Sequence, residues 1–89
     1  MRETEFGQIV ISKAGHDKGN LYICLDFDGK YVILADGKLK TLASPKKKNP
    51  RHIQAAGFVD EELVRAKAEG RLNDEMIKRS LKVFARCGQ

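Results

Sequence analysis

The sequence predicts an α+β fold, in which a mainly β part of five short strands is followed by two short helices. Short apolar runs separated by glycine-containing turns fill most of residues 1–56, and two of those turns are Asp-Gly pairs. From residue 57 onward the apolar spacing changes to that of amphipathic helices. Five short strands joined by tight turns favour a small barrel, because closure removes exposed edges. We therefore expect a barrel over residues 1–56 and a helical C-terminal extension over residues 57–89.

The first two strands are expected at residues 7–13 and 21–27, on either side of a glycine-rich loop. The first contains a continuous apolar run, Ile9-Val10-Ile11, which indicates a strand with both faces covered. The second alternates apolar side chains with others such as Tyr22 and Cys24, which indicates a strand with one face toward a core.

Two Asp-Gly turns, at residues 28–29 and 36–37, separate the later strands. Type I′ turns need positive φ at both central positions, which is why Asp-Gly pairs mark hairpins. We expect the three remaining strands at residues 30–35, 38–42 and 51–55. Residues 44–50, bounded by Ser-Pro and Asn-Pro pairs, are expected to present three lysines on a surface loop.

Two helices are expected in the C-terminal extension. Asp60 can cap the first, which should stop at Gly70, and Asn73 can cap the second. The second helix has one apolar face, formed by Ile77, Leu81 and Phe84. This face is expected to pack on the barrel or on the first helix, and the alternative is that it forms a groove for a partner.

Composition limits the class of protein. At 89 residues the chain is the size of one domain, and no apolar run approaches the roughly 18 residues of a membrane span. We identify no signal peptide, so the cytoplasm is the expected location and no membrane contact is expected. Cys24 and Cys87 show no CxxC spacing, and neither a bound metal nor a cofactor is expected.

The loop Gly15-His16-Asp17-Lys18-Gly19 has two interpretations. Its glycines let the turn close and leave backbone N–H groups bare beside a cation, which suits a phosphate oxygen. The alternative is a plain hairpin turn whose charges are solvated.

The charge distribution favours a nucleic-acid partner. The net charge is +5, and residues 38–52 contain six cations and no acid. The six are Lys38, Lys40, Lys46, Lys47, Lys48 and Arg51. An acid-free basic block in a short domain is the electrostatic pattern expected for nucleic acid, and the alternative is a solvated basic loop.

The stretch from Gly7 to Gly19, which reads GQIVISKAGHDKG, resembles a KOW motif. This motif is found in several ribosomal large-subunit proteins and in NusG-type transcription elongation factors. Gly19 stands where the motif carries its hallmark glycine, and Gly-His-Asp-Lys-Gly is similar to the loop of ribosomal KOW proteins. Lys46–Gln54 resembles the basic loop and last barrel strand of the archaeal and eukaryotic ribosomal group, to which small bacterial proteins are also similar.

The resemblance implies a five-stranded SH3-like barrel that binds RNA, often ribosomal RNA. It also implies structural roles for Gly7, Gly15 and Gly19. With the basic block, it assigns RNA contacts to Lys13, His16, Lys18, Asn20, Lys38, Lys40, Lys46, Lys47, Lys48, Arg51 and His52. The two loops are then expected to form one surface, which requires them to lie side by side.

Phosphate contacts from Lys and Arg would carry most of the affinity for RNA. His16, Asn20 and His52 would contact bases or riboses. Tyr22 and Tyr31 are further candidates for such contacts, and the alternative for both is packing within their strands.

The expected function is that of a non-catalytic RNA-binding protein, associated with ribosomal RNA or the ribosome in translation. The alternative is a protein-interaction adaptor in translation or transcription elongation, in which the helices dock a ribosomal or transcription protein. An enzyme is not expected, because the sequence has no carboxylate pair, nucleophile–base set or GxxxxGK[ST] motif.

Overall fold

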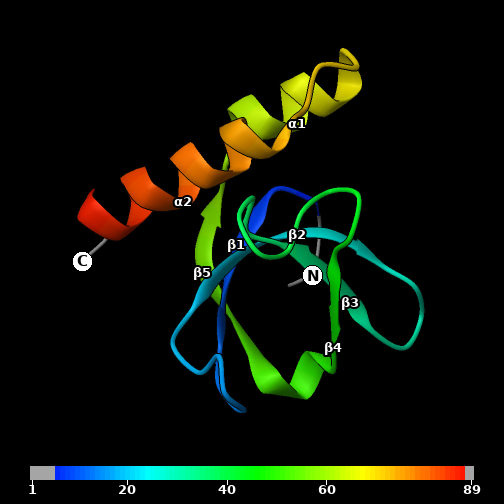
Figure 1. Cartoon of the computed structure of the whole chain (residues 1–89), viewed down its shortest axis with the longest axis vertical. Helices are drawn as coiled ribbons and strands as arrows, with labels where there is room; N and C mark the ends of the chain where they lie inside the picture. Colours follow the sequence, from blue (N-terminus) through cyan, green and yellow to red (C-terminus); the bar gives the residue numbers. More distant parts are fainter. Residues whose placement is uncertain (1–5, 88–89) are drawn as a thin grey trace.

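The computed structural model describes residues 6–87, which form a five-stranded antiparallel sheet with two helices on one of its faces (Figure 1). The strands are β1 (Gln8–Ser12), β2 (Leu21–Phe27), β3 (Val32–Ala35), β4 (Lys46–Lys48) and β5 (Ile53–Val59). The helices are the short 3-10 turn η1 (Pro50–His52), α1 (Glu61–Ala68) and α2 (Asp74–Cys87). The strand order is β4-β3-β2-β1-β5, and the predicted α+β class with five strands and two helices is confirmed.

The sheet is covered on both faces, as the continuous apolar run in β1 predicts. Ile9 and Ile23 are fully buried in one cluster, which the helices cover with Leu63, Ile77 and Leu81. The neighbouring residues along the same strands face the opposite way, because side chains alternate across a strand. They form a second cluster of Val10, Tyr22, Cys24, Val32, Leu34 and Ile53. The prediction that β2 buries only one face is therefore wrong, since Tyr22 and Cys24 lie in this second cluster.

Local capping starts both helices where the sequence indicates. The Asp60 carboxylate accepts the N–H of Glu62 at 3.0 Å, and the Asn73 side chain accepts the N–H of Met76 at 2.9 Å. Asp60 also accepts a hydrogen bond from the Ser80 hydroxyl of α2, which ties the two helices together. The apolar face of α2 packs against the sheet, as one of the two sequence interpretations expects.

The fourth strand is not where the sequence places it. Residues 38–42 form a loop, because their backbone N–H groups bond to carboxylates instead of to a strand. Asp36 accepts the N–H groups of Lys38 and Lys40, and Asp74 of α2 accepts the N–H of Leu42 at 2.8 Å. The strand at the edge of the sheet is Lys46–Lys48, in the segment expected to be a loop, and it pairs with β3.

The fifth strand continues to Val59, beyond the predicted boundary at residue 56. Its partner is β1, and both β1–β5 and β2–β3 contain a register shift that bends the sheet. Within the described residues no ladder joins the edge strands β4 and β5, which are instead connected by η1 (Figure 1). The helices bury the same sheet face as Ile9 and Ile23, so they form one core with the β part.

The turn at Asp36–Lys40 packs closely on α2, and Gly37 is the point of closest contact. Its φ is +80°, and a Cβ placed there would lie 2.9 Å from the backbone nitrogen of Lys78 and closer still to the carbonyl oxygen of Asp74. We expect Gly37→Ala to lower the free energy of unfolding by roughly 2–4 kcal/mol, because strain at positive φ adds to displacement of α2. Urea denaturation followed by circular dichroism measures the loss.

Gly29→Ala is the matched control, since Gly29 has a φ of +97° and nothing within 4 Å of the added Cβ. This variant should lose only the strain of a left-handed residue, about 1–2 kcal/mol. Equal losses in the two variants would contradict the close packing of Gly37 on α2.

Candidate nucleic-acid interface

The two loops assigned to RNA lie side by side. The first loop, residues 13–20, connects β1 to β2, and η1 connects β4 to β5. The backbone N–H of Lys13 donates to the carbonyl of His52 at 2.7 Å, and the Lys48 ammonium donates to the carbonyl of Ala14 at 3.1 Å. These two bonds hold the start of the first loop against η1 and the end of β4.

The first loop closes through its own backbone. Gly19, with a φ of +93°, donates its N–H to the Ser12 carbonyl at 2.8 Å, and the Lys18 N–H donates to the Gly15 carbonyl at 3.2 Å. The Asn20 N–H similarly donates to the Asp17 carbonyl at 2.9 Å. The expectation of bare amides is therefore wrong for Lys18, Gly19 and Asn20, whose N–H groups bond to carbonyls of β1 and of the loop itself.

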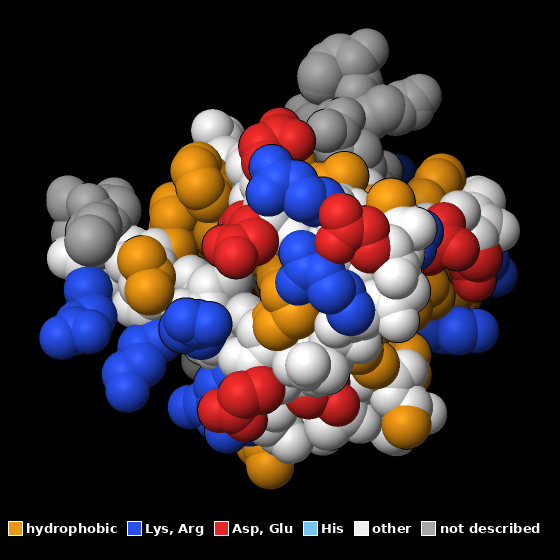
Figure 2. Space-filling model, turned by 90° about the horizontal axis from the view of Figure 1, so that it is seen from above, with side chains coloured by type: hydrophobic (Ala, Val, Ile, Leu, Met, Phe, Trp, Pro, Cys, Tyr) orange, Lys and Arg blue, Asp and Glu red, His pale blue; other side chains and the backbone are white. Residues whose placement is uncertain are grey.

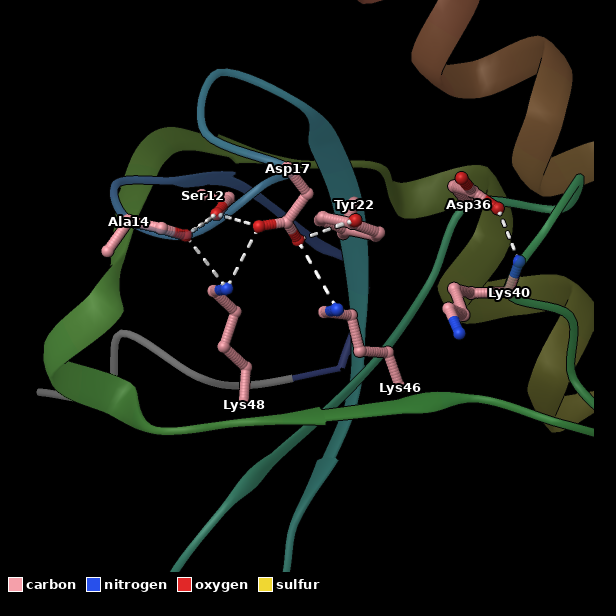
Figure 3. A network of polar contacts seen from close by, with 8 residues as sticks. All are labelled: Ser12, Ala14, Asp17, Tyr22, Asp36, Lys40, Lys46 and Lys48. Carbon is pink, nitrogen blue, oxygen red and sulfur yellow. Dashed lines mark hydrogen bonds and ion pairs between the residues drawn. The ribbon is translucent and has the colours of Figure 1, made fainter.

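The Asp17 carboxylate stands at the centre of the interface (Figure 3). It accepts hydrogen bonds from the hydroxyls of Ser12 at 2.9 Å and Tyr22 at 2.8 Å. Lys48 donates to it at 3.0 Å, and the Lys46 ammonium lies 3.6 Å away. The donors come from β1, β2 and β4, so one side chain of the loop links three strands.

This environment shifts two pKa values in opposite directions. Burial alone would raise the pKa of the Asp17 carboxyl, but bonds from Tyr22, Lys48 and Ser12 and the charge of Lys46 lower it well below its usual range. Burial, together with the bond to the Asp17 carboxylate, raises the pKa of the Tyr22 hydroxyl to about 12. Both pKa shifts favour the same pair of protonation states, in which the Asp17 carboxylate is ionised and the Tyr22 hydroxyl keeps its proton.

The three lysines of β4 do not share one role, because alternate residues of a strand face opposite sides. Lys46 and Lys48 point toward Asp17 (Figure 3), and the Lys48 side chain is only 11% exposed. Lys47 faces away, is 65% exposed, and lies 3.9 Å from Asp28. Lys46 and Lys48 thus neutralise an internal carboxylate, and of the three only Lys47 presents its charge outward.

The exposed candidate residues gather on the rim of the two loops. Asn49 accepts the N–H of Arg51 at 2.9 Å and so fixes η1, which leaves Arg51 and His52 exposed. The exposed members of this rim are Lys13, His16, Lys18, Asn20, Arg51 and His52. We call these six residues the loop rim.

The remaining candidates lie apart from the rim or inside the fold. Lys38 is exposed and Lys40 half-buried in the turn that packs on α2. Tyr22 is buried with its hydroxyl on Asp17, so its strand-packing interpretation is the correct one. Gly7, Gly15 and Gly19 all have positive φ.

Sequence reasoning missed Asp17 as the organising residue. The available signal was an acid within a basic loop whose neighbouring strand carries a tyrosine. The partners Lys46 and Lys48 lie about thirty residues further along the chain, where no local pattern connects them to Asp17.

No protein-family model and no curated protein matches the chain. Among the residues that the structure describes, no group of three or more His, Cys, Asp or Glu side chains could hold a metal ion. None of the helices within residues 6–87 has the length and apolar character needed to cross a membrane.

Asp17→Asn tests the network by removing one charge while preserving shape. At neutral pH we expect the free energy of unfolding to fall by roughly 2–4 kcal/mol, because Lys48 stays shielded from water without a counter-charge. The lowered pKa of Asp17 stabilises the folded protein above the ordinary value of 3.8, and this stability is lost as pH falls below it. Denaturation across a pH series should therefore show an acid loss in the wild type that is much smaller in the variant.

Asp26→Asn provides the control, because Asp26 is an exposed carboxylate at the far end of β2. This variant should keep the acid-dependent loss of the wild type. If Asp17→Asn shows that same loss, Asp17 is not its source.

Proposed function

We propose that this protein is a non-catalytic RNA-binding protein whose curved sheet is a KOW-type, SH3-like barrel, acting on structured or ribosomal RNA. The observation that carries the proposal is the contact of the two loops. Lys13 and His52 are joined through their backbones, and Asp17 pairs with Lys46 and Lys48 beneath them. The exposed cations of the loop rim are thus held on a rigid support with their charges available.

The strand order supports the barrel. The last strand returns to pair with the first, and the two edge strands are joined by the short η1. The KOW-like loop lies between the first two strands, where the resemblance places it. A ribosomal association and a cytoplasmic location remain predictions from the sequence.

The chemistry of the loop rim suits an RNA backbone. Lys13, Lys18 and Arg51 are exposed cations that can pair with phosphates, and Arg can do so through two parallel hydrogen bonds. His16 and His52 can donate to or accept from a ribose hydroxyl or a base edge. Such a surface reads the shape of folded RNA more than its sequence, so we propose modest sequence specificity.

The triple variant K13Q/K18Q/R51Q tests the loop rim and leaves the network around Asp17 intact. We expect roughly tenfold weaker binding to a fluorescein-labelled RNA hairpin at low salt, because three phosphate contacts are lost. The slope of log affinity against log salt concentration should fall by about 2 or more. Fluorescence anisotropy over a salt series measures both.

The matched control is K30Q/R65Q/K67Q, which also removes two lysines and one arginine, all exposed and all away from the two loops. It should bind the hairpin with nearly wild-type affinity and salt slope. Equal effects of the two triple variants would mean that net charge, and not the loop rim, governs binding.

An apolar groove on the helices favours a second function, that of a protein-interaction adaptor. It has a volume of about 430 Å³ and lies between α1 and α2 beside the end of β5. Phe58 and Val83 line it and are both about half exposed, and the Phe58 ring lies 5.8 Å from that of Phe84. Contiguous exposed apolar side chains are typical of protein-binding surfaces.

For the adaptor function, we expect Phe58→Asp to abolish recovery of a protein partner from ribonuclease-treated extract while RNA affinity is retained, because Phe58 lines this groove. The charge would stand in the apolar groove without a partner, which disfavours docking. Recovery of the same partner by the variant would exclude this groove as its docking site.

A further inference from the structure

A second groove runs between α2 and the loops of the sheet. It has a volume of about 990 Å³. On the sheet side it is lined by Asn20 of the loop rim and by Lys38 of the turn after β3. On the helix side it is lined by Lys78, Arg79, Lys82 and Arg86. The groove thus brings two of the sequence-predicted RNA residues next to helix cations that sequence reasoning assigned to no function.

The groove is strongly cationic. Five Lys or Arg residues line it, against two carboxylates that are already engaged. Asp36 accepts backbone N–H groups of its own turn, and Glu75 lies 3.6 Å from Lys78. Within the described part of the chain, no carboxylate lies within ion-pair distance of Lys82 or Arg86. Figure 2, which looks down on the helices, shows Lys and Arg side chains gathered beside the C-terminal end of α2.

The spacing of these cations suits a polyanion. Lys78, Lys82 and Arg86 recur every four residues, so they share one face of α2 at intervals of about 6 Å along its axis. Like charges at this spacing repel one another and destabilise an isolated helix. Lys82 and Arg86 contribute nothing to the core, since both are exposed. A row of phosphates bound along this face would offset the repulsion between the three cations.

We propose that this groove binds the sugar–phosphate backbone of the RNA that contacts the loop rim, so that α2 forms the second half of one RNA interface. The proposal rests on the proposed function. The groove is continuous with the loop rim, because Gly19 and Asn20 of the first loop line it. Apolar side chains also line the groove, and Leu39, which is 85% exposed, can contact ribose faces while the cations hold the phosphates.

The double variant K82Q/R86Q tests this groove in the full chain. We expect its affinity for the labelled RNA hairpin to fall roughly three- to tenfold at low salt, with a salt slope lower by about 1–2. The control R65Q/K67Q removes the same two residue types from α1 and should match the wild type. The charge-preserving variant K82R/R86K should also bind like the wild type. Thermal melting of each variant confirms that the fold is retained.

The outcomes separate the two proposals. If K13Q/K18Q/R51Q loses affinity and K82Q/R86Q binds like the wild type, the groove does not contact RNA and the loop rim alone does. If K82Q/R86Q loses affinity and the rim variant does not, RNA contacts the groove but not the rim, and both the rim assignment and the single continuous interface fail. If the wild-type protein binds no better than both variants, both proposals are overturned. Loss of affinity in both variants, but not in R65Q/K67Q, supports one interface that extends from the rim to α2.

Discussion

The carboxylate of Asp17 is the constraint on which the rest of this structure depends. A carboxylate that is only 13% exposed is costly unless its oxygens are bonded and its charge is compensated. Ser12, Tyr22 and Lys48 supply the bonds, and Lys46 adds a second positive charge. Because these partners come from β1, β2 and β4, satisfying one charge also sets the position of the first loop against the edge of the sheet. The inner lysines are therefore structural, and the cations left exposed around them are the ones available to a ligand.

A two-sided sheet explains why the helices belong to the same folded unit. Ile9 and Ile23 face α1 and α2, whereas Val10 and Cys24 face the second buried cluster on the opposite side of the sheet. Without the helices the first of these faces would be exposed to water. The same packing directs α2 so that its apolar stripe meets the sheet and its row of cations borders the groove beside Asn20 and Lys38. Burial of the apolar face of α2 thus determines which of its cations face the groove.

Rigidity and charge combine in the proposed RNA interface. The loop rim is supported by the backbone bond between Lys13 and His52 and by the capping of η1 by Asn49, so its backbone needs little ordering before it binds. Lys and Arg on such a support favour any phosphate backbone, and the shape of the surface decides which folds of RNA fit. The groove along α2 would lengthen the same surface. The distance between the loop rim and α2 would then limit which RNA folds can contact both.

Local chemistry determined much of this fold from the sequence alone. The apolar runs of β1 and β2, the glycine-rich loop between them and the caps Asp60 and Asn73 each act within a few residues, so their patterns can be read directly. The tertiary structure decided the rest. Three consecutive lysines form β4 because Asp17, some thirty residues earlier, compensates two of them, and residues 38–42 form a loop because Asp74 captures the N–H of Leu42. Lysine disfavours strands in general, and no local pattern reveals a distant carboxylate, so only the folded chain could show which cations are bound inside and which face outward.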